Sequence, residues 1–208
     1  MSDDESGPSE EDASTGEGTP TDEGYVSELR ANREEKDDFF GSHPQSPIPP
    51  EHREGFDGLD YFAPAPEHRV DATVETHDDP EPVPMETTAD GEVRYVRVVT
   101  FSFDLDGETR ELHGYRQQPD DDEEPIFVPF RDKTTGQESY RGGRYLELHP
   151  DGEVTDGDSV LVDFNLAYTP FCAFSEAFEC PLPPEENWLE TAVPAGERDP
   201  TASKSASQ

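Results

Sequence analysis

Residues 126–148 form a slightly basic block in a strongly acidic chain, and the arginines of this block are the first candidates for chemistry. Planar guanidinium groups bind carboxylate or phosphate through two parallel hydrogen bonds, so Arg131 and Arg144 could hold an anionic ligand, with Asp132 beside them. The alternative is structural pairing with a carboxylate such as Asp132 or Asp163. We favour pairing, although one arginine can pair with a carboxylate while another binds a ligand.

Asp163, Asn165 and Tyr168 form a second polar cluster. Alternation along a strand would place Asp163 and Asn165 on one face, and Tyr168 could add a phenol to them. The apolar run before Asp163 predicts that its carboxylate is at least partly buried, so it must be paired or have a raised pKa. Arg131 or Arg144 would satisfy it. Alternatively, Asp163 is a general base, with Tyr168 as a second catalytic candidate.

Glu186 and Asn187 complete the candidate site. They follow a proline-rich segment and precede Trp188. Asn187 is most simply a turn residue that bonds the backbone. Glu186 could face the arginines, and we retain both residues as ligand-binding candidates.

The motifs of several large enzyme classes are absent from the sequence. There is no G-x-G-x-x-G, Walker loop, H-E-x-x-H or G-x-S-x-G. Cys172 and Cys180 lack the C-x-x-C spacing of zinc sites, so we predict no metal and name no cofactor. Both cysteines are predicted to be small buried side chains, and a Cys172–Cys180 bridge is the alternative.

Sequence periodicity predicts the elements that position these residues. Alternating apolar residues predict strands from Arg69 onward, and Asp106-Gly107 is a strong two-residue hairpin signal. We expect a mainly β protein, an antiparallel β-sandwich or partly open barrel of about seven or more short strands. The predicted strands include residues 92–105, 126–130, 144–148, 159–165 and 189–193.

One β-rich domain accounts for most of the chain in this interpretation. Helical spacing and four later prolines predict an N-terminal helix followed by an extended strap. The expected order is an acidic tail (1–22), a domain (23–196) made of a helix (23–40), a strap (42–66) and a β core (69–194), and a second tail (197–208).

The charge balance excludes several classes of partner. The chain of 208 residues carries 51 acidic and 15 basic residues, a formal net charge of −36. Such a chain repels nucleic acid and anionic membranes, and its polar N-terminal stretch resembles neither a signal peptide nor a membrane span. We predict a halophilic, cytoplasmic protein. The alternative of a disordered acidic chain is disfavoured because the aromatic residues cluster in the middle of the sequence. Oligomeric state is left open.

Several short segments resemble a known family. They are FVPFRD (127–132), GRYL (143–146), DFN (163–165) and CPLPP (180–184). On these the chain, from about residue 39 to 197, resembles the uncharacterised family called domain of unknown function 1684. The resemblance implies no established activity and therefore no catalytic roles. Thr169-Pro170 departs from the Asn-Pro expected there, which makes Thr169 a poor candidate for essential chemistry.

Two hypotheses for function remain. In the first, the polar residues line a small-molecule site, binding or enzymatic, for an anionic or carbonyl-bearing ligand. In the second, the same residues form the structural polar core of a non-enzymatic β-rich interaction module. A site requires polar groups that converge on an open pocket, whereas a structural network is closed.

Overall fold

The structure is a computed structural model that describes residues 22–77, 79, 82–118, 124–150 and 152–200. Within them lie one α-helix, α1 (Asp22–Ser42), and seven strands: β1 (Arg69–Thr76), β2 (Pro82–Glu86), β3 (Glu92–Leu105), β4 (Glu108–Arg116), β5 (Ile126–Phe130), β6 (Arg144–Leu148) and β7 (Ser159–Asp163). Five short 3-10 helices complete the described part: η1 (Pro50–Gly55), η2 (Pro66–His68), η3 (Phe164–Leu166), η4 (Phe171–Ala173) and η5 (Glu185–Asn187).

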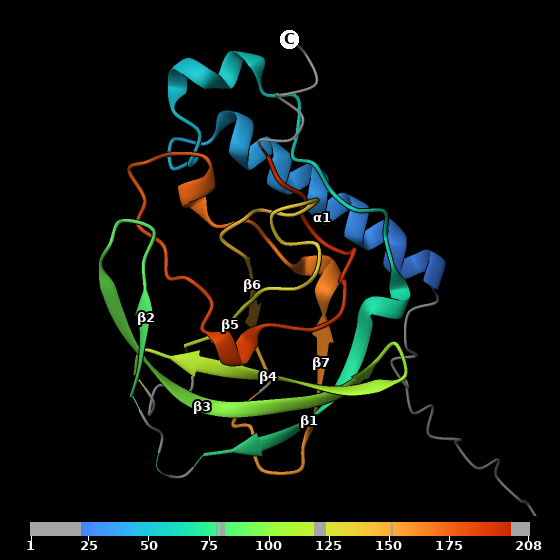
Figure 1. Cartoon of the computed structure of the whole chain (residues 1–208). Coiled ribbons are helices and arrows are strands. Elements are labelled where there is room, and N and C mark those ends of the chain that lie inside the picture. The colour runs from blue at the N-terminus through green and yellow to red at the C-terminus, as the bar shows by residue number, and fades with distance from the viewer. Residues whose placement is uncertain (1–21, 78, 80–81, 119–123, 151, 201–208) are drawn as a thin grey trace, which may run out of the picture.

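The strands form one antiparallel sheet that curls into a half-barrel (Figure 1). Its order is β6-β5-β4-β3-β1-β7, with β2 paired to β3. The two edge strands are joined just beyond the end of β7, where Tyr145 and Tyr168 exchange backbone hydrogen bonds of 2.9 Å. The predicted mainly β fold is confirmed, in its partly open barrel form.

Period-2 alternation fills the inside of this half-barrel. Val99, Phe101, Phe103 and Leu105 of β3 all point into the apolar core. The predicted hairpin is present, and both central residues have positive φ, 55° at Asp106 and 78° at Gly107. This is the conformation that matches the right-handed twist of paired strands.

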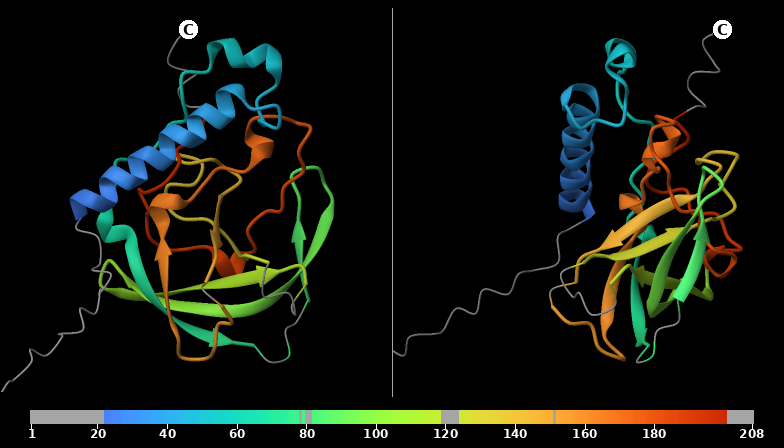
Figure 2. Two further views of the ribbon diagram at one scale, coloured as in Figure 1. Left: turned by 180° about the vertical axis from the view of Figure 1, so that it is seen from behind. Right: turned by 90° about the vertical axis from the view of Figure 1, so that its left-hand side faces the viewer.

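The α-helix crosses the side of the sheet on which the edges β6 and β7 lie (Figure 2). It buries Tyr25, Leu29 and Phe40. The helix is longer than predicted, because it continues through Gly41 to Ser42, whose hydroxyl donates to the carbonyl of Asp38 at 2.7 Å. A glycine in a helix costs only about 1 kcal/mol, so it does not by itself end one.

Several predicted segments differ from the structure, and the strap predicted as extended contains the 3-10 helix η1. Residues 189–193 form no strand, although Trp188 makes an isolated parallel bridge to Arg131. The folded part also extends beyond residue 196, since Glu197 is buried and its carboxylate accepts from Thr169 N and pairs with Lys36. The predicted tail of residues 1–22 loses Asp22 to α1, and the rest of it and residues 201–208 lie outside the described residues.

Candidate functional site

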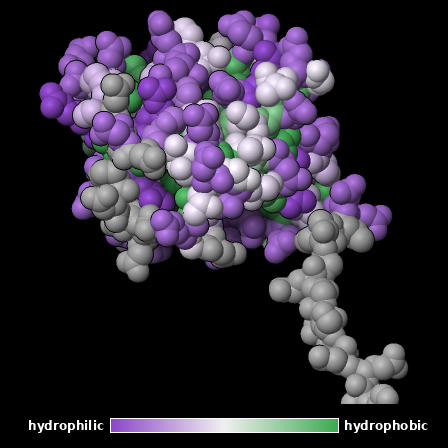
Figure 3. Space-filling model, turned by 90° about the horizontal axis from the view of Figure 1, so that it is seen from below, coloured by the Kyte–Doolittle hydropathy of each residue, from purple (hydrophilic) through white to green (hydrophobic). Residues whose placement is uncertain are grey.

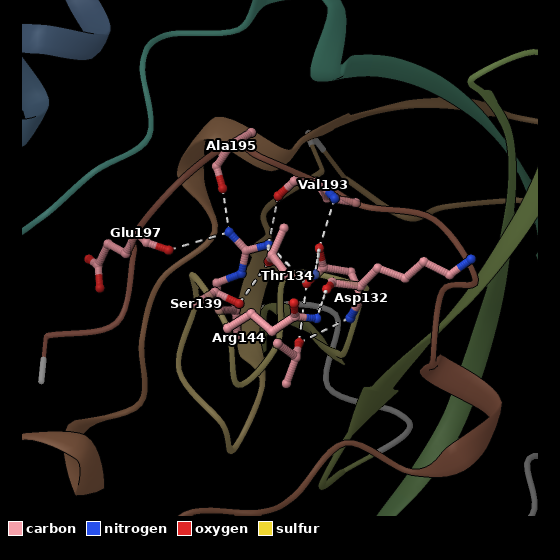
Figure 4. A network of polar contacts seen from close by, with 10 residues as sticks. Asp132, Thr134, Ser139, Arg144, Val193, Ala195 and Glu197 are labelled. Carbon is pink, nitrogen blue, oxygen red and sulfur yellow. Dashed lines mark hydrogen bonds and ion pairs between the residues drawn. The ribbon is translucent and has the colours of Figure 1, made fainter. Parts of the chain in front are cut away.

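Arg144 lies at the centre of a buried polar network (Figure 4). Its fully buried Nη2 donates to Asp132 Oδ1 at 3.2 Å and to the carbonyl of Val193 at 2.9 Å. Nη1 donates to the carbonyls of Ala195 and Glu197. These carbonyls are directed at a guanidinium rather than at a neighbouring strand, which explains why the C-terminal segment does not join the sheet.

The carboxylate of Asp132 is equally enclosed. Its Oδ2 accepts from the backbone nitrogens of Val193 at 2.7 Å and Thr134 at 3.1 Å. Its Oδ1 accepts from the hydroxyls of Thr134 and Thr135, in addition to Arg144. Burial lowers the pKa of Arg144, and the charge of Asp132 opposes that shift. Every hydrogen bond of the pair runs within the protein and both side chains are fully buried, so the geometry is that of a structural network, although Arg144 Nε has no partner among the described residues.

Asp163 is paired as well, but with other partners than predicted. The hydroxyl of Tyr25 lies 2.8 Å from Oδ2 and 3.1 Å from Oδ1, and Arg69 Nε lies 3.2 Å from Oδ2. The prediction that Arg131 or Arg144 would pair with Asp163 is therefore wrong. The correct partners come from α1 and β1, which flank the carboxylate.

Asn165 serves the same junction. It lies in η3 rather than on the strand face predicted for it, because β7 ends at Asp163. Its backbone and side-chain nitrogens both donate to Asp163 Oδ1 at 3.0 Å. Its amide also exchanges two hydrogen bonds of 2.8 Å with the backbone of Ala65, which ties the strap to the sheet.

Tyr168 lies apart from the Asp163 cluster. Its hydroxyl donates to Glu147 at 2.6 Å, and Lys36 Nζ makes a cation–π contact 4.9 Å from the centre of its ring. Burial and the neighbouring Glu147 raise its pKa, so the phenol stays protonated at neutral pH.

Asn187 and Glu186 take separate roles. Asn187 is fully buried and clamps the backbone, accepting from His113 N at 2.8 Å and donating to the carbonyls of His113 and Pro129. This agrees with its predicted use in bonding the backbone. Glu186 accepts from Tyr115 at 2.5 Å and pairs with Arg97 at 3.3 Å, so its arginine partner comes from β3.

A cavity of about 280 Å³ lies at the open side of the half-barrel, where α1 faces β6 and β7. Five leucines line it, and the remaining residues, which include Tyr25, Arg69 and Asp163, are polar or charged. The carboxylate of Asp163 already accepts from three donor groups, the Tyr25 hydroxyl of α1 and two nitrogens of Asn165 in η3, in addition to the ion pair with Arg69. It is therefore a poor general base, and this cavity is the less favourable place for chemistry.

A second cavity, which we call the Trp188 cleft, is lined by two of the predicted site residues, Arg131 and Asp132. It encloses about 350 Å³ between Arg131, Asp132, Lys133, Thr135, Arg141, Trp188, Leu189 and Glu190. The guanidinium of Arg131 lies 4.9 Å from the centre of the Trp188 ring, and 45% of Trp188 is exposed. Arg131 Nε is buried without a hydrogen-bond partner among the described residues. Burial lowers the pKa of Arg131.

Several residues that line these two cavities were not identified from the sequence. Trp188 carries a usable signal, because it is the sole tryptophan and follows Glu186 and Asn187 directly. Tyr25 and Arg69 carry no such signal, since only the fold brings them to Asp163. Among the described residues, no group of three or more His, Cys, Asp or Glu side chains could hold a metal ion.

Together the curled sheet, the crossing helix and the buried Arg144 network define a mainly β protein with partly open cavities at its surface. The chain belongs to the family described as "Protein of unknown function (DUF1684)", whose model matches residues 54–198. It is similar to a solution NMR structure of an uncharacterised protein from Haloarcula marismortui, at 62% identity and a TM-score of 0.68, over 85% of this chain and 95% of that one. No curated protein matches.

Proposed function

We propose that this chain binds a small anionic molecule, bearing a carboxylate or phosphate, in the Trp188 cleft. The observation that carries the proposal is local charge. Three cationic side chains, Arg131, Lys133 and Arg141, line one cavity in a chain whose net charge is −36. Cationic side chains that lie close together repel one another, and a bound anion would offset that repulsion.

The neighbouring carboxylates compensate that positive charge only in part. Asp132 is turned inward to Arg144, and the side chain of Glu190 is 83% exposed and reaches Lys133 only at 4.0 Å. The structure pairs Arg131 with no carboxylate among the described residues. A guanidinium stacked on an indole is held in orientation and keeps its in-plane donors available for a ligand.

The backbone around the cleft gives the site a rigid base. Arg131 N donates to the carbonyl of Asn187 at 3.0 Å, and Leu189 N donates to the carbonyl of Arg131 at 2.8 Å. These bonds fix Arg131 beside Trp188 on both sides. Because Asn187 is itself clamped to β4 and β5, the two ligand-facing side chains are held by the sheet.

Replacing Arg131 with glutamine is expected to weaken anion binding by about tenfold or more, since a hydrogen bond to a charged group contributes about 1.5–3 kcal/mol. Trp188 is the sole tryptophan, so its fluorescence reports on this cleft alone. The measurement is a titration with inorganic phosphate and citrate at constant ionic strength. Because Arg131 lies beside Trp188, the variant Arg131→Gln has a different fluorescence in the absence of ligand. Its affinity for the anions is therefore also measured by isothermal titration calorimetry.

The matched control is Arg94→Gln on β3, which removes the same charge from a side chain that is 81% exposed and pairs only loosely with Glu92. It should bind like the wild type. Equal losses in the two variants would show a general charge effect, and no response to either anion in the wild type would reject the proposal. Mass spectrometry of small molecules retained on purification in high salt would then identify the natural ligand class.

A halophilic, cytoplasmic setting is supported by the acidic composition and by the similarity to a haloarchaeal protein. The face in Figure 3 is dominated by hydrophilic side chains, with apolar groups in small separate areas. Within the described residues, no helix is long and apolar enough to cross a membrane. Nucleic acid and anionic membranes are poor partners for a chain of this charge.

Salt is expected to stabilise the fold strongly. Repulsion among 51 acidic groups weakens as the Debye length shrinks to about 3 Å at molar salt. We expect the melting temperature to rise by about 10 °C or more between low and molar potassium chloride, equivalent to about 3 kcal/mol for a domain of this size. Calorimetry across the salt series measures it, and a flat melting temperature would contradict the halophilic assignment.

A further inference from the structure

Cys172 and Cys180 lie together beside a third cavity, away from the open side of the half-barrel. Cys172 belongs to η4 and is partly exposed, whereas Cys180 is buried at the end of the loop that follows. Both thiols are free. The cavity encloses about 370 Å³, and the charged side chains lining it are Arg141, Glu176 and Asp199.

The surroundings of Cys172 favour a thiolate. Its sulfur is hydrogen bonded by the side chains of Cys180 and Thr88, and the hydroxyl of Tyr140 lies 4.0 Å away. The hydrogen bond from Cys180 is the main cause that lowers the pKa of Cys172 to about 6, against the opposing effect of burial. The same pairing raises the pKa of Cys180. The two thiols are therefore unequal at neutral pH.

The backbone holds one cysteine more firmly than the other. Cys180 N donates to Thr88 Oγ1 at 3.2 Å, and Thr88 N donates to the carbonyl of Cys180 at 3.0 Å. Residues 176–179 between the cysteines are exposed. A displacement of Cys172 would involve η4, where Phe171 and Phe174 pack against Phe40 of α1, as well as the exposed residues 176–179. Cys180 is held next to β2 by its backbone bonds to Thr88.

We propose that Cys172 is a site of oxidation by small hydroperoxides and that Cys180 is its resolving partner. The Cys172 thiolate attacks the terminal peroxide oxygen and the O–O bond breaks. The leaving group, an alkoxide from an organic hydroperoxide or hydroxide from hydrogen peroxide, takes a proton and departs as an alcohol or as water. Cys172 is oxidised by two electrons to a sulfenic acid, and the peroxide is reduced. Cys180 then attacks the Cys172 sulfur, an S–S bond forms, the S–O bond breaks, and the hydroxyl leaves as water with the proton of Cys180.

Three features in one place support this assignment. The sulfur that reacts first borders an open cavity, the second sulfur is within hydrogen-bonding reach but buried, and donors surround the first. A structural cysteine buried among apolar side chains differs from Cys172, because such burial raises the thiol pKa and keeps the thiol protonated. The inference goes beyond anion binding in the Trp188 cleft, although Arg141 lines both cavities.

The test uses the reduced full chain in high salt, treated with one equivalent of hydrogen peroxide at pH 7. In the wild type, both thiols should become unavailable to N-ethylmaleimide together, and mass spectrometry should show a Cys172–Cys180 disulfide. In Cys180→Ser, dimedone should label Cys172 as a sulfenic acid. In Cys172→Ser, Cys180 should react at least about tenfold more slowly than Cys172 does in Cys180→Ser.

A pH profile separates this chemistry from simple exposure. Alkylation of native Cys172 by iodoacetamide should titrate with a midpoint near 6 and shift toward about 8.5 in denaturant. Melting temperatures verify that both variants fold. An unshifted midpoint in the native protein, modification of Cys180 before Cys172, or a sulfenic acid that persists in the wild type would each overturn the proposal.

Discussion

Replacing Asp132 with asparagine should destabilise the protein by about 3–5 kcal/mol, the cost of removing one partner from a buried ion pair. Asp132 and Arg144 are both fully buried at the side chain, so the guanidinium would be left with carbonyl partners and no opposite charge. The loss is a large share of the about 5–15 kcal/mol by which domains are stable. Urea unfolding in high salt measures the change.

Two further variants make this prediction specific. Asp71→Asn removes the same charge from an exposed position of β1 and should leave stability within about 0.5 kcal/mol of the wild type. Replacing the pair together, with Asp132→Leu and Arg144→Met, should destabilise at least as much as Asp132→Asn, because the backbone groups that the pair now bonds would be left buried without partners. If Asp132→Asn unfolded like the wild type, the network would not depend on that charge.

Asp163→Asn should destabilise by about 2–4 kcal/mol, somewhat less because Arg69 is 20% exposed and water can solvate it. The carboxylate accepts from three donor groups, of which the Tyr25 hydroxyl is one, and a single amide oxygen can replace only part of these hydrogen bonds. Because Tyr25 lies on α1, the loss should also loosen the helix locally. Denaturant unfolding gives the first quantity, and hydrogen exchange gives the second.

Hydrogen exchange should accelerate in residues 22–42 before it does in the central strands. The companion variant Tyr25→Phe keeps the ring over Arg69 and removes only the hydroxyl, so it should loosen α1 with a smaller global loss. A variant Asp163→Asn with unchanged stability would instead make Asp163 a functional group facing the cavity at the open side.

Most of the sheet could be predicted because strand alternation and turn motifs depend only on residues that are close together in the sequence. The alternation of β3 and the Asp106-Gly107 turn specify a hairpin without reference to the rest of the chain. Strand β2 was missed since Pro82 and Pro84 argue against a strand, and an edge position tolerates them. Residues 189–193 have the composition of a strand, but their segment is drawn to Arg144 and Asp132 instead.

The candidate site was harder to predict because charge pairing is a property of the fold. The sequence contains more arginines than buried carboxylates, and nothing local decides which pair meets. Tyr25 and Asp163 are 138 residues apart, and Arg69 reaches Asp163 only through the pairing of β1 with β7. The basic block was correctly noticed, yet one of its arginines became structural and another faces the Trp188 cleft.

The attachment of α1 also has a consequence for the order in which the protein is made. The helix is translated before the sheet, but its polar partners are translated late, since Tyr25 bonds Asp163 and Lys36 pairs with Glu197 at 2.6 Å. Contacts so distant along the chain are expensive to close before the intervening residues fold. During synthesis on the ribosome, α1 can therefore dock on the half-barrel only after Asp163 and Glu197 have left the exit tunnel.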